Sequence, residues 1–391
     1  MTDAHVTESV GGVRGGAGPH QFVRTQTVPA MPPPRRRTGV IGWMQENLFS
    51  STGNTALTLF GLLVVYLTVP SFLDWAIFSA TWTGDGREAC LREGAGACWP
   101  FIEAKWGQFM YGRYPLEERW RVDTTFCLGV VGLVPMLIPS VPWKFWNAFY
   151  LLVPYPVIAF FLLTGGAFSL PPVETTVWGG MLVTLVVAIT GIVASLPLGI
   201  LLALGRRSKL PVIRMLSIGF IEAWRGVPLI TVLFMASVML PLFLPEGVTF
   251  DKLLRCLVAV ALFSSAYMAE VVRGGLQAIP RGQYEGAQAL GLSYWRMMIF
   301  IILPQALKTV IPGIVNNFIA LFKDTTLVLI IGLFDLLGII QLNFTDSEWS
   351  TPQTAITGYV FAAFLYFVIC SGMSQYSRYM ERRLDTGHRN D

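Results

Sequence analysis

A polar tetrapeptide interrupts a long apolar run in the last third of the chain. Lys323-Asp324-Thr325-Thr326 sets a cation, an anion and two hydroxyls side by side within residues 308–331. Ionisable groups at membrane depth are costly and usually face a protein interior or a water-filled cavity. Two roles are open for this tetrapeptide: lining a pathway where it contacts a zwitterionic solute, or forming an ion pair that holds helices together.

Further polar groups lie in or beside apolar runs. They are Asn316 and Asn317 in the same run as the tetrapeptide, and two acid–base pairs at a spacing of three, Glu222 with Arg225 and Glu270 with Arg273. For the asparagines we expect hydrogen bonds between helices rather than solute contact. Each acid–base pair can close along one helix face, so we expect both to anchor the inner ends of spans. Their alternative role is to transmit movement from a neighbouring loop.

The five cysteines divide into two groups. Cys127, Cys256 and Cys370 lie in apolar runs, where we expect them to serve as packing residues. Cys90 and Cys98 share a connection that we place outside the membrane, where an oxidising compartment permits a disulfide. The spacing alone does not decide whether they are bridged. No pair of Cys or His has the spacing of a zinc site, so no metal site is expected.

The composition predicts an all-α integral membrane protein. Of 391 residues, 53% are hydrophobic and 13% are charged, against roughly 25% charged in soluble domains, and the mean hydropathy is +0.57. Since a span needs about 20 apolar residues, we expect about eight spans. They fall near 53–73, 124–142, 144–164, 177–204, 226–245, 253–272, 308–331 and 354–376. A membrane-bound enzyme would need a cluster of His or carboxylates at one depth, and the runs contain almost none.

Basic residues predict the orientation of these spans. Clusters of Lys and Arg precede the first run and follow the fourth, sixth and eighth, which with an even number of spans puts both termini in the cytoplasm. Residues 1–40 are typical of a disordered cytoplasmic tail. Residues 41–172 hold three spans and the exported loop 74–123, within which 99–121 is expected to be a helix lying on the outer membrane surface. Residues 173–385 hold the other five spans and the inner loop 276–304.

A break is expected before the fifth span. Residues 211–245 are far longer than one crossing requires, so 211–224 should lie along the cytoplasmic face or enter at a steep angle. The crossing itself should begin near Gly226-Val227-Pro228.

The inner loop carries its own helix signals. Pro280 and Gly282 should end the sixth span, and Glu285 should fall in the first turn of a short helix, where its charge favours the helix dipole. Gly291 should end that helix and Ser293 should cap the next one. The apolar positions at helical spacing are Tyr284, Ala287 and Leu290. Because so short a helix is not stable by propensity alone, it needs a protein partner or the membrane surface to hold it.

These motifs together resemble one transporter family. Glu285-Gly286-Ala287, then Gly291, then Ile301-Ile302-Leu303-Pro304, is similar to the cytoplasmic "EAA" loop of bacterial ABC-type importer permeases, with Gly286 where that family usually has Ala. The segments around Glu222, Glu270 and Lys323 resemble the polar amino acid branch, and the likeness covers about 170–385. The N-terminal block resembles the larger permease of the general L-amino acid importers of Gram-negative bacteria.

The resemblance implies a permease subunit of the inner membrane, not an enzyme, that moves L-amino acids from periplasm to cytoplasm. Its implied partners are a second permease, two ABC ATPase subunits and a periplasmic amino acid-binding protein. The resemblance implies that the second permease is a paralogue of this chain. The implied ATPase-coupling residues are Tyr284, Glu285, Gly286, Ala287, Leu290 and Gly291. No G-x-x-x-x-G-K-[ST] phosphate loop occurs in the chain, so ATP and Mg²⁺ are expected on the partner ATPase and no cofactor on this chain. An ion-gradient-driven secondary amino acid transporter is the alternative.

Overall fold

The computed structural model describes residues 39–245 and 250–384. The chain forms two compact units, the first ending at Ser71 and the second beginning at Phe72. The predicted tail, 1–40, lies outside the described residues except for its last two. The predicted division at 172 and 173 stays a prediction, and the second unit runs continuously across it.

The first unit contains α1 (Val40–Asn47) and most of α2 (Thr52–Leu73). The Ser51 hydroxyl accepts a hydrogen bond from the Asn54 backbone N–H at 3.1 Å, which satisfies one of the unpaired donors at the start of α2. The helical run continues to Phe78 and is long and apolar enough to cross a membrane.

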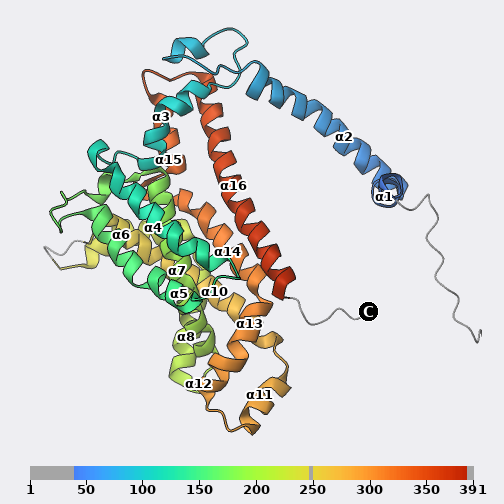
Figure 1. Ribbon diagram of the computed structural model, residues 1–391, viewed down its shortest axis with the longest axis vertical. Helices are drawn as coiled ribbons and strands as arrows, with labels where there is room; N and C mark the ends of the chain where they lie inside the picture. Colours follow the sequence, from blue (N-terminus) through green and yellow to red (C-terminus); the bar gives the residue numbers. More distant parts are fainter. Residues whose placement is uncertain (1–38, 246–249, 385–391) are drawn as a thin grey trace, which may run out of the picture. The chain divides into compact units, whose positions relative to one another are not determined.

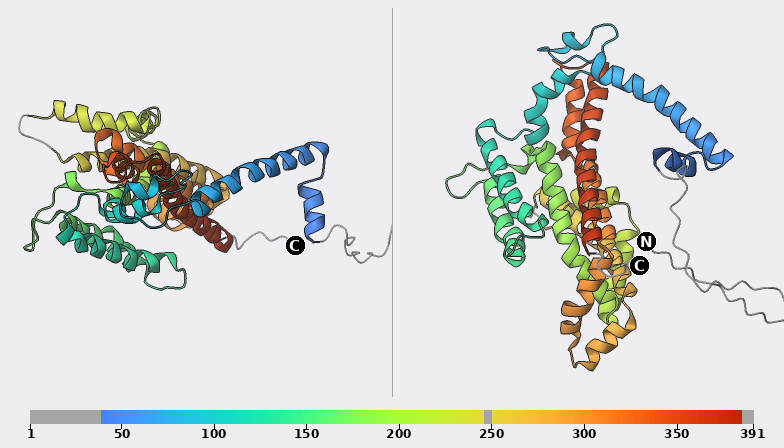
Figure 2. Two further views of the ribbon diagram at one scale, coloured as in Figure 1. Left: turned by 90° about the horizontal axis from the view of Figure 1, so that it is seen from above. Right: turned by 45° about the vertical axis from the view of Figure 1, so that its right-hand side comes forward.

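The second unit holds the remaining elements. They are α3 (Trp99–Tyr111), α4 (Arg119–Leu137), α5 (Lys144–Leu152), α6 (Pro154–Thr164), α7 (Gly180–Arg206), α8 (Pro211–Arg225), α9 (Leu229–Phe234), α10 (Lys252–Ala278), α11 (Arg281–Ala289), α12 (Tyr294–Met297), α13 (Leu303–Thr309), α14 (Ile311–Asp324), β1 (Phe334–Asp335), α15 (Leu336–Leu342) and α16 (Pro352–Leu384). In Figures 1 and 2, α3 and the start of α16 lie at one end of this unit, whereas α11 and α12 lie at the other.

The predicted all-α membrane fold of about eight spans is confirmed. Seven helical runs within the described residues are long and apolar enough to span, and eight if α8 and the segment Leu229–Phe243 count as one bent span. These two parts meet at 101°, with the break falling at Gly226–Pro228 as predicted. Helix α8 packs against both α7 and α10. Its predicted position along the cytoplasmic face, or entering at a steep angle, stays a prediction.

The centre of the unit is the contact between α7 and α10. Small residues recur every four positions on α7, at Gly191, Ser195, Gly199 and Ala203. A Cβ on Gly199 would lie 2.6 Å from the Met268 side chain of α10, so only glycine fits there. Small residues at this spacing let two helix backbones approach closely inside a membrane.

Helix α3 has one face packed against protein: Phe101 and Phe109 are fully buried against α15 and α16. Its predicted place on the outer membrane surface stays a prediction. Gly112 and Gly180, both with positive φ, let the chain after α3 cross the start of α7, where a Cβ on Gly180 would lie 2.1 Å from the Phe109 carbonyl oxygen. The pattern of aromatics among charges does not distinguish a helix buried against protein from one resting on lipid.

Candidate functional site

The helix α11 begins where proline breaks the chain. α10 ends at Ala278, and α11 starts at Arg281 directly after Pro280. Gly282 does not end α10 as predicted: it lies in the first turn of α11, where an added Cβ would meet nothing within 4 Å. Proline alone makes the break, because it disfavours helical backbone at the residue before it. Glu285 is the fifth residue of α11 and lies beyond the first turn, so the predicted dipole contact is wrong.

The end of α11 is the one predicted. Gly291 has φ 71°, a conformation that glycine adopts without strain. Its N–H donates to the Gln288 carbonyl at 2.9 Å, and the Leu292 N–H donates to the Ala287 carbonyl at 3.2 Å, the paired closure of a Schellman motif. Ser293 stands at the N-cap position of α12, but its side chain makes no capping hydrogen bond.

The two faces of α11 have different surroundings. Ala287 is only 2% exposed and packs with the half-buried Tyr284 against the ends of the spans. Glu285 and Gly286 are exposed, and so is Leu290, at 78%. The predicted apolar stripe of three is therefore only two residues wide, and Leu290 belongs to the outward face. We call Glu285, Gly286 and Leu290 the outward face of α11.

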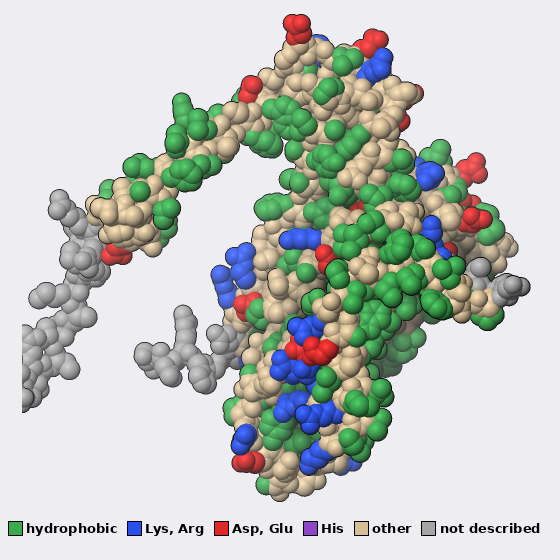
Figure 3. Space-filling view, turned by 180° about the vertical axis from the view of Figure 1, so that it is seen from behind, with side chains coloured by type: hydrophobic (Ala, Val, Ile, Leu, Met, Phe, Trp, Pro, Cys, Tyr) green, Lys and Arg blue, Asp and Glu red, His purple; other side chains and the backbone are tan. Residues whose placement is uncertain are grey.

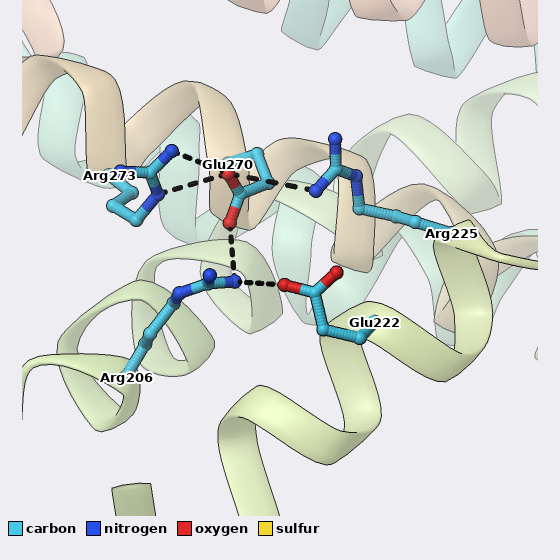
Figure 4. A network of polar contacts seen from close by, with 5 residues as sticks. All are labelled: Arg206, Glu222, Arg225, Glu270 and Arg273. Carbon is cyan, nitrogen blue, oxygen red and sulfur yellow. Dashed lines mark hydrogen bonds and ion pairs between the residues drawn. The ribbon is translucent and has the colours of Figure 1, made fainter.

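Five charged residues form a network beside this helix (Figure 4). Glu270 of α10 accepts from Arg273 at 2.7 Å and from Arg206 at 2.8 Å, and lies 3.6 Å from Arg225. The same Nη1 of Arg206 donates to Glu222 of α8 at 2.8 Å. The network thus joins α7, α8 and α10. Figure 3 shows charged side chains gathered toward the end of the unit where α8, α11 and α12 lie.

The network corrects one of the two predicted pairs. Glu270 and Arg273 pair along α10 as the spacing predicts. Glu222 and Arg225 do not pair with each other: Glu222 contacts Arg206, and Arg225 reaches Glu270 and stacks on the Tyr267 ring with its Cζ 5.6 Å from the centroid. Arg225 is the last residue of α8, so its side chain is free to turn toward α10.

Arg206 and Arg207 were missed by the sequence argument. They appeared there only as part of a basic cluster, although they end α7 and contact different partners. Arg207 donates to the Leu276 carbonyl at 3.0 Å and to the Tyr284 hydroxyl at 3.1 Å, with its Cζ 5.6 Å from the Tyr284 ring centroid. The Tyr284 hydroxyl donates to the same Leu276 carbonyl at 3.1 Å. Nothing local in the sequence indicates contacts over such separations.

The tetrapeptide at the end of α14 divides into exposed and buried members. Lys323 is exposed and Asp324 is half-buried, and no ion pair joins them or links either to another described residue. Thr325 is buried and donates to the Phe322 carbonyl at 2.8 Å, while Thr326 donates to the Lys323 carbonyl at 3.0 Å. The two hydroxyls therefore serve the local helix end.

The two asparagines of α14 also differ in their exposure to solvent. Asn316 is exposed, on the same helix face as Ala320 and Lys323. Asn317 is half-buried, and its Nδ2 is buried without a hydrogen-bond partner among the described residues. The expected bonding between helices is therefore absent from the described part of this chain. A polar stripe of Asn316 and Lys323 is left on the helical run Ile311–Ile331, which is long and apolar enough to span.

At the opposite end, the loop between α2 and α3 and the helix α3 are fastened to the rest of the unit. Cys90 and Cys98 are joined in a disulfide with a Cα–Cα distance of 5.7 Å. Lys105 of α3 pairs with Asp346 at 2.7 Å, and this hydrogen bond lowers the pKa of the Asp346 carboxyl from its ordinary value. The Cys98 N–H donates to the Thr357 hydroxyl of α16 at 2.9 Å.

The comparisons with known proteins match both parts of the chain. Residues 195–386 match the family described as "Binding-protein-dependent transport system inner membrane component". The chain is 52% identical to the inner membrane amino-acid ABC transporter permease protein YhdY of Escherichia coli strain K12, over 92% of this chain and 97% of that protein. It is 41% identical to the glutamate/glutamine/aspartate/asparagine transport system permease protein BztC of Rhodobacter capsulatus, over 94% and 99%.

Shorter relatives match only part of the chain. The probable glutamine ABC transporter permease protein GlnP of Bacillus subtilis is 34% identical over 53% of this chain and 92% of its own length. Among solved structures, a chain of "an amino acid ABC transporter with histidines" is 30% identical over 52% of this chain and 92% of that chain, with a TM-score of 0.46.

Proposed function

Because the chain belongs to the family of binding-protein-dependent transport system inner membrane components, we propose that it is the permease subunit of an ATP-driven importer. Its cargo is L-amino acids, carried from the periplasm to the cytoplasm. The full-length likeness to YhdY and BztC, whose names state amino-acid transport, supports this class of cargo. Family membership also sets aside the secondary transporter.

One structural observation carries the proposal: α11 is held on one side and open on the other. Tyr284 and Ala287 fix it to the spans, whereas Glu285, Gly286 and Leu290 face outward. A helix of nine residues is marginal in isolation, so its rigidity comes from the bundle beneath it. The outward face of α11 is then free to fill a groove in an ATPase subunit, and displacement of that subunit moves α11 with it.

The family membership supports the following partners. Two ATPase subunits, each receiving one such helix, bind ATP and Mg²⁺, since this chain has no phosphate loop. A second permease, a paralogue, completes the pathway, and a periplasmic amino acid-binding protein delivers the cargo. The chain lies in the inner membrane with both termini in the cytoplasm, because the basic clusters collect on that side.

The polar stripe of α14 is our choice for the pathway surface on this chain. Lys323 and Asn316 are exposed on one face of α14, which is part of the spanning run Ile311–Ile331, and neither is bonded to another described side chain. Charged groups in spans face water or cargo rather than lipid, so the Lys323 ammonium is placed to meet the carboxylate of a passing amino acid. Asp324 is next to it in the sequence, whereas the Thr325 and Thr326 hydroxyls donate to carbonyls of their own helix end and Asn317 is half-buried.

Uptake into proteoliposomes tests the proposed function. The complex of both permeases and the ATPase is reconstituted with the binding protein outside and ATP inside. We expect uptake of labelled L-amino acids that requires ATP and continues when ionophores dissipate proton and sodium gradients. Uptake that continues without ATP and stops with the ionophores would overturn the proposal.

A further inference from the structure

Two successive arginines at the end of α7 contact two different parts of the transporter. Arg206, the last residue of α7, is bonded to carboxylates on α8 and α10. Arg207, its immediate neighbour, is bonded to Tyr284 of α11 and stacks on its ring. One peptide bond therefore separates the contact to α11 from the charge network.

The contact to α11 is a closed triangle. Arg207 and the Tyr284 hydroxyl both donate to the Leu276 carbonyl, and Arg207 also donates to that hydroxyl. Leu276 lies near the end of α10, so the triangle joins α7, α10 and α11. A displacement of α11 against α10 must stretch or break at least one of these three bonds.

In the charge network beyond it, one arginine serves two carboxylates. A single nitrogen of Arg206, Nη1, is shared between Glu222 and Glu270, at 2.8 Å each. Glu270 is mostly buried and has two further arginines near it, whereas the Glu222 side chain is 55% exposed. If Arg206 moves, it can release Glu222 to solvent and keep Glu270. An element with two discrete arrangements is what coupling between distant sites requires.

We propose that Arg207 is a positioning residue that carries the displacement of α11 to Arg206, so that α8 is released from or held against α7 and α10 in step with the ATPase. This inference rests on the proposed function. It assigns coupling to the last residue of α7 and the residue that follows it, outside the loop that we expect the ATPase to contact. Tyr284 is the receiving residue on α11, because it is the half-buried side chain that Arg207 contacts.

The test compares uptake per ATP hydrolysed among variants of the full complex in proteoliposomes, with a mixture of labelled L-amino acids as the probe. The variants are Arg207→Gln, Tyr284→Phe and the two combined. Tyr284→Phe removes one oxygen atom and keeps the ring, so it preserves the packing of α11. The matched control is Lys209→Gln, two residues further on, which removes an exposed cation with no bond to another described side chain.

We expect each single variant to lower uptake per ATP about 5-fold or more, which is the size of effect that typical coupling free energies produce. The combined variant should lose no more than the more impaired of the two single variants. Lys209→Gln should match the wild type, and Arg207→Lys, which restores the charge, should recover part of the loss. Unchanged uptake per ATP in Tyr284→Phe, or losses that multiply in the combined variant, would overturn the inference. If Arg207→Gln fails to assemble, Tyr284→Phe decides alone.

The same experiment separates the two proposals. A wild-type complex that shows no ATP-dependent uptake contradicts the proposed function itself. An ATP-dependent wild type with variants that equal it contradicts only the coupling role of Arg207.

Discussion

Arg206 and Glu270 are 64 residues apart in sequence, yet Arg206 Nη1 lies 2.8 Å from Glu270 Oε1. Around this bond α7, α8 and α10 are held together by ion pairs, and the next residue, Arg207, contacts the helix α11 that we expect an ATPase to bind. The bond joins the last residue of one span to a mostly buried carboxylate on another. Its contribution to the free energy of unfolding is therefore the first property to measure.

Glu270→Gln should destabilise the protein much more than Glu222→Gln. Glu270 has three arginines around it and a side chain only 15% exposed, so its loss leaves cations with poorly paired partners and costs about 2–3 kcal/mol. Glu222 makes one bond from a side chain that is 55% exposed, a setting in which an ion pair contributes less than about 1 kcal/mol. Thermal unfolding of the two variants in detergent measures the difference. Equal losses would contradict this ranking.

Lys323→Gln should impair transport and leave stability unchanged. The ammonium is exposed and bonded to no other described side chain, so folding loses little. A charge-assisted bond to cargo contributes about 1.5–3 kcal/mol, which corresponds to a loss of about 10-fold or more in uptake efficiency. Lys308→Gln, another exposed cation on the preceding helix α13, is the control and should transport normally. A normal uptake rate in Lys323→Gln would remove this residue from the pathway.

The disulfide predicts how many thiols react. Cys90 and Cys98 are joined, and the three free cysteines are Cys127, Cys256 and Cys370. Protein purified without reductant and denatured should take up three maleimides, and five after reduction. The bridge closes a short loop, with a sequence separation of 8, so Cys90→Ser with Cys98→Ser should cost about 2–3 kcal/mol. Five reactive thiols before reduction would contradict the bridge.

The Lys105–Asp346 pair should make the end of the unit that contains α3 sensitive to acid in a defined pH window. The pKa of Asp346 is lowered in the folded protein by the Lys105 hydrogen bond, whereas an unfolded aspartate titrates near about 3.9. A lowered folded pKa means that the pair's stabilisation, about 1 kcal/mol, is complete above about pH 3.9 and is lost as the pH falls through the folded value. The unfolding temperatures of the wild type and Asp346→Asn should therefore differ by a constant amount from pH 7 to pH 5 and converge at more acidic pH. A difference in unfolding temperature that grows as the pH falls would contradict a lowered pKa of Asp346 in the folded protein.

Composition and local signals were sufficient for much of the fold. Apolar run length predicted the spans, and Pro228 and Gly291 marked a break and a helix end, because these residue types act on their own backbone. A further signal was available and unused: the small residues from Gly191 to Ala203 recur every four positions, which indicates the face of α7 that approaches another helix.

The predictions that were wrong concern contacts between residues that are distant in the sequence. Whether Arg225 pairs with Glu222 or Glu270 is decided by how α8 packs on α10, and a spacing of three does not contain that information. Likewise Lys105 pairs with Asp346, which is 241 residues later in the sequence. The packed helix α3 therefore carries a cation, and its sequence resembles that of a helix lying on a surface. The hydrogen bonds among Arg207, Leu276 and Tyr284 could not be predicted for the same reason.

We propose that the outward face of α11 lies in a groove of an ATPase subunit. The test is cross-linking from Gly286→Cys, labelled with a photoreactive maleimide after Cys127, Cys256 and Cys370 are replaced by Ala. This position suits the label because a Cβ there meets nothing within 4 Å of this chain. The control is Glu88→Cys, which is exposed and close to the disulfide at the other end of the unit. We predict that in the assembled complex Gly286→Cys forms an adduct with the ATPase subunit and Glu88→Cys does not. Adducts from Gly286→Cys with lipid alone, in a complex that still hydrolyses ATP, would contradict the account.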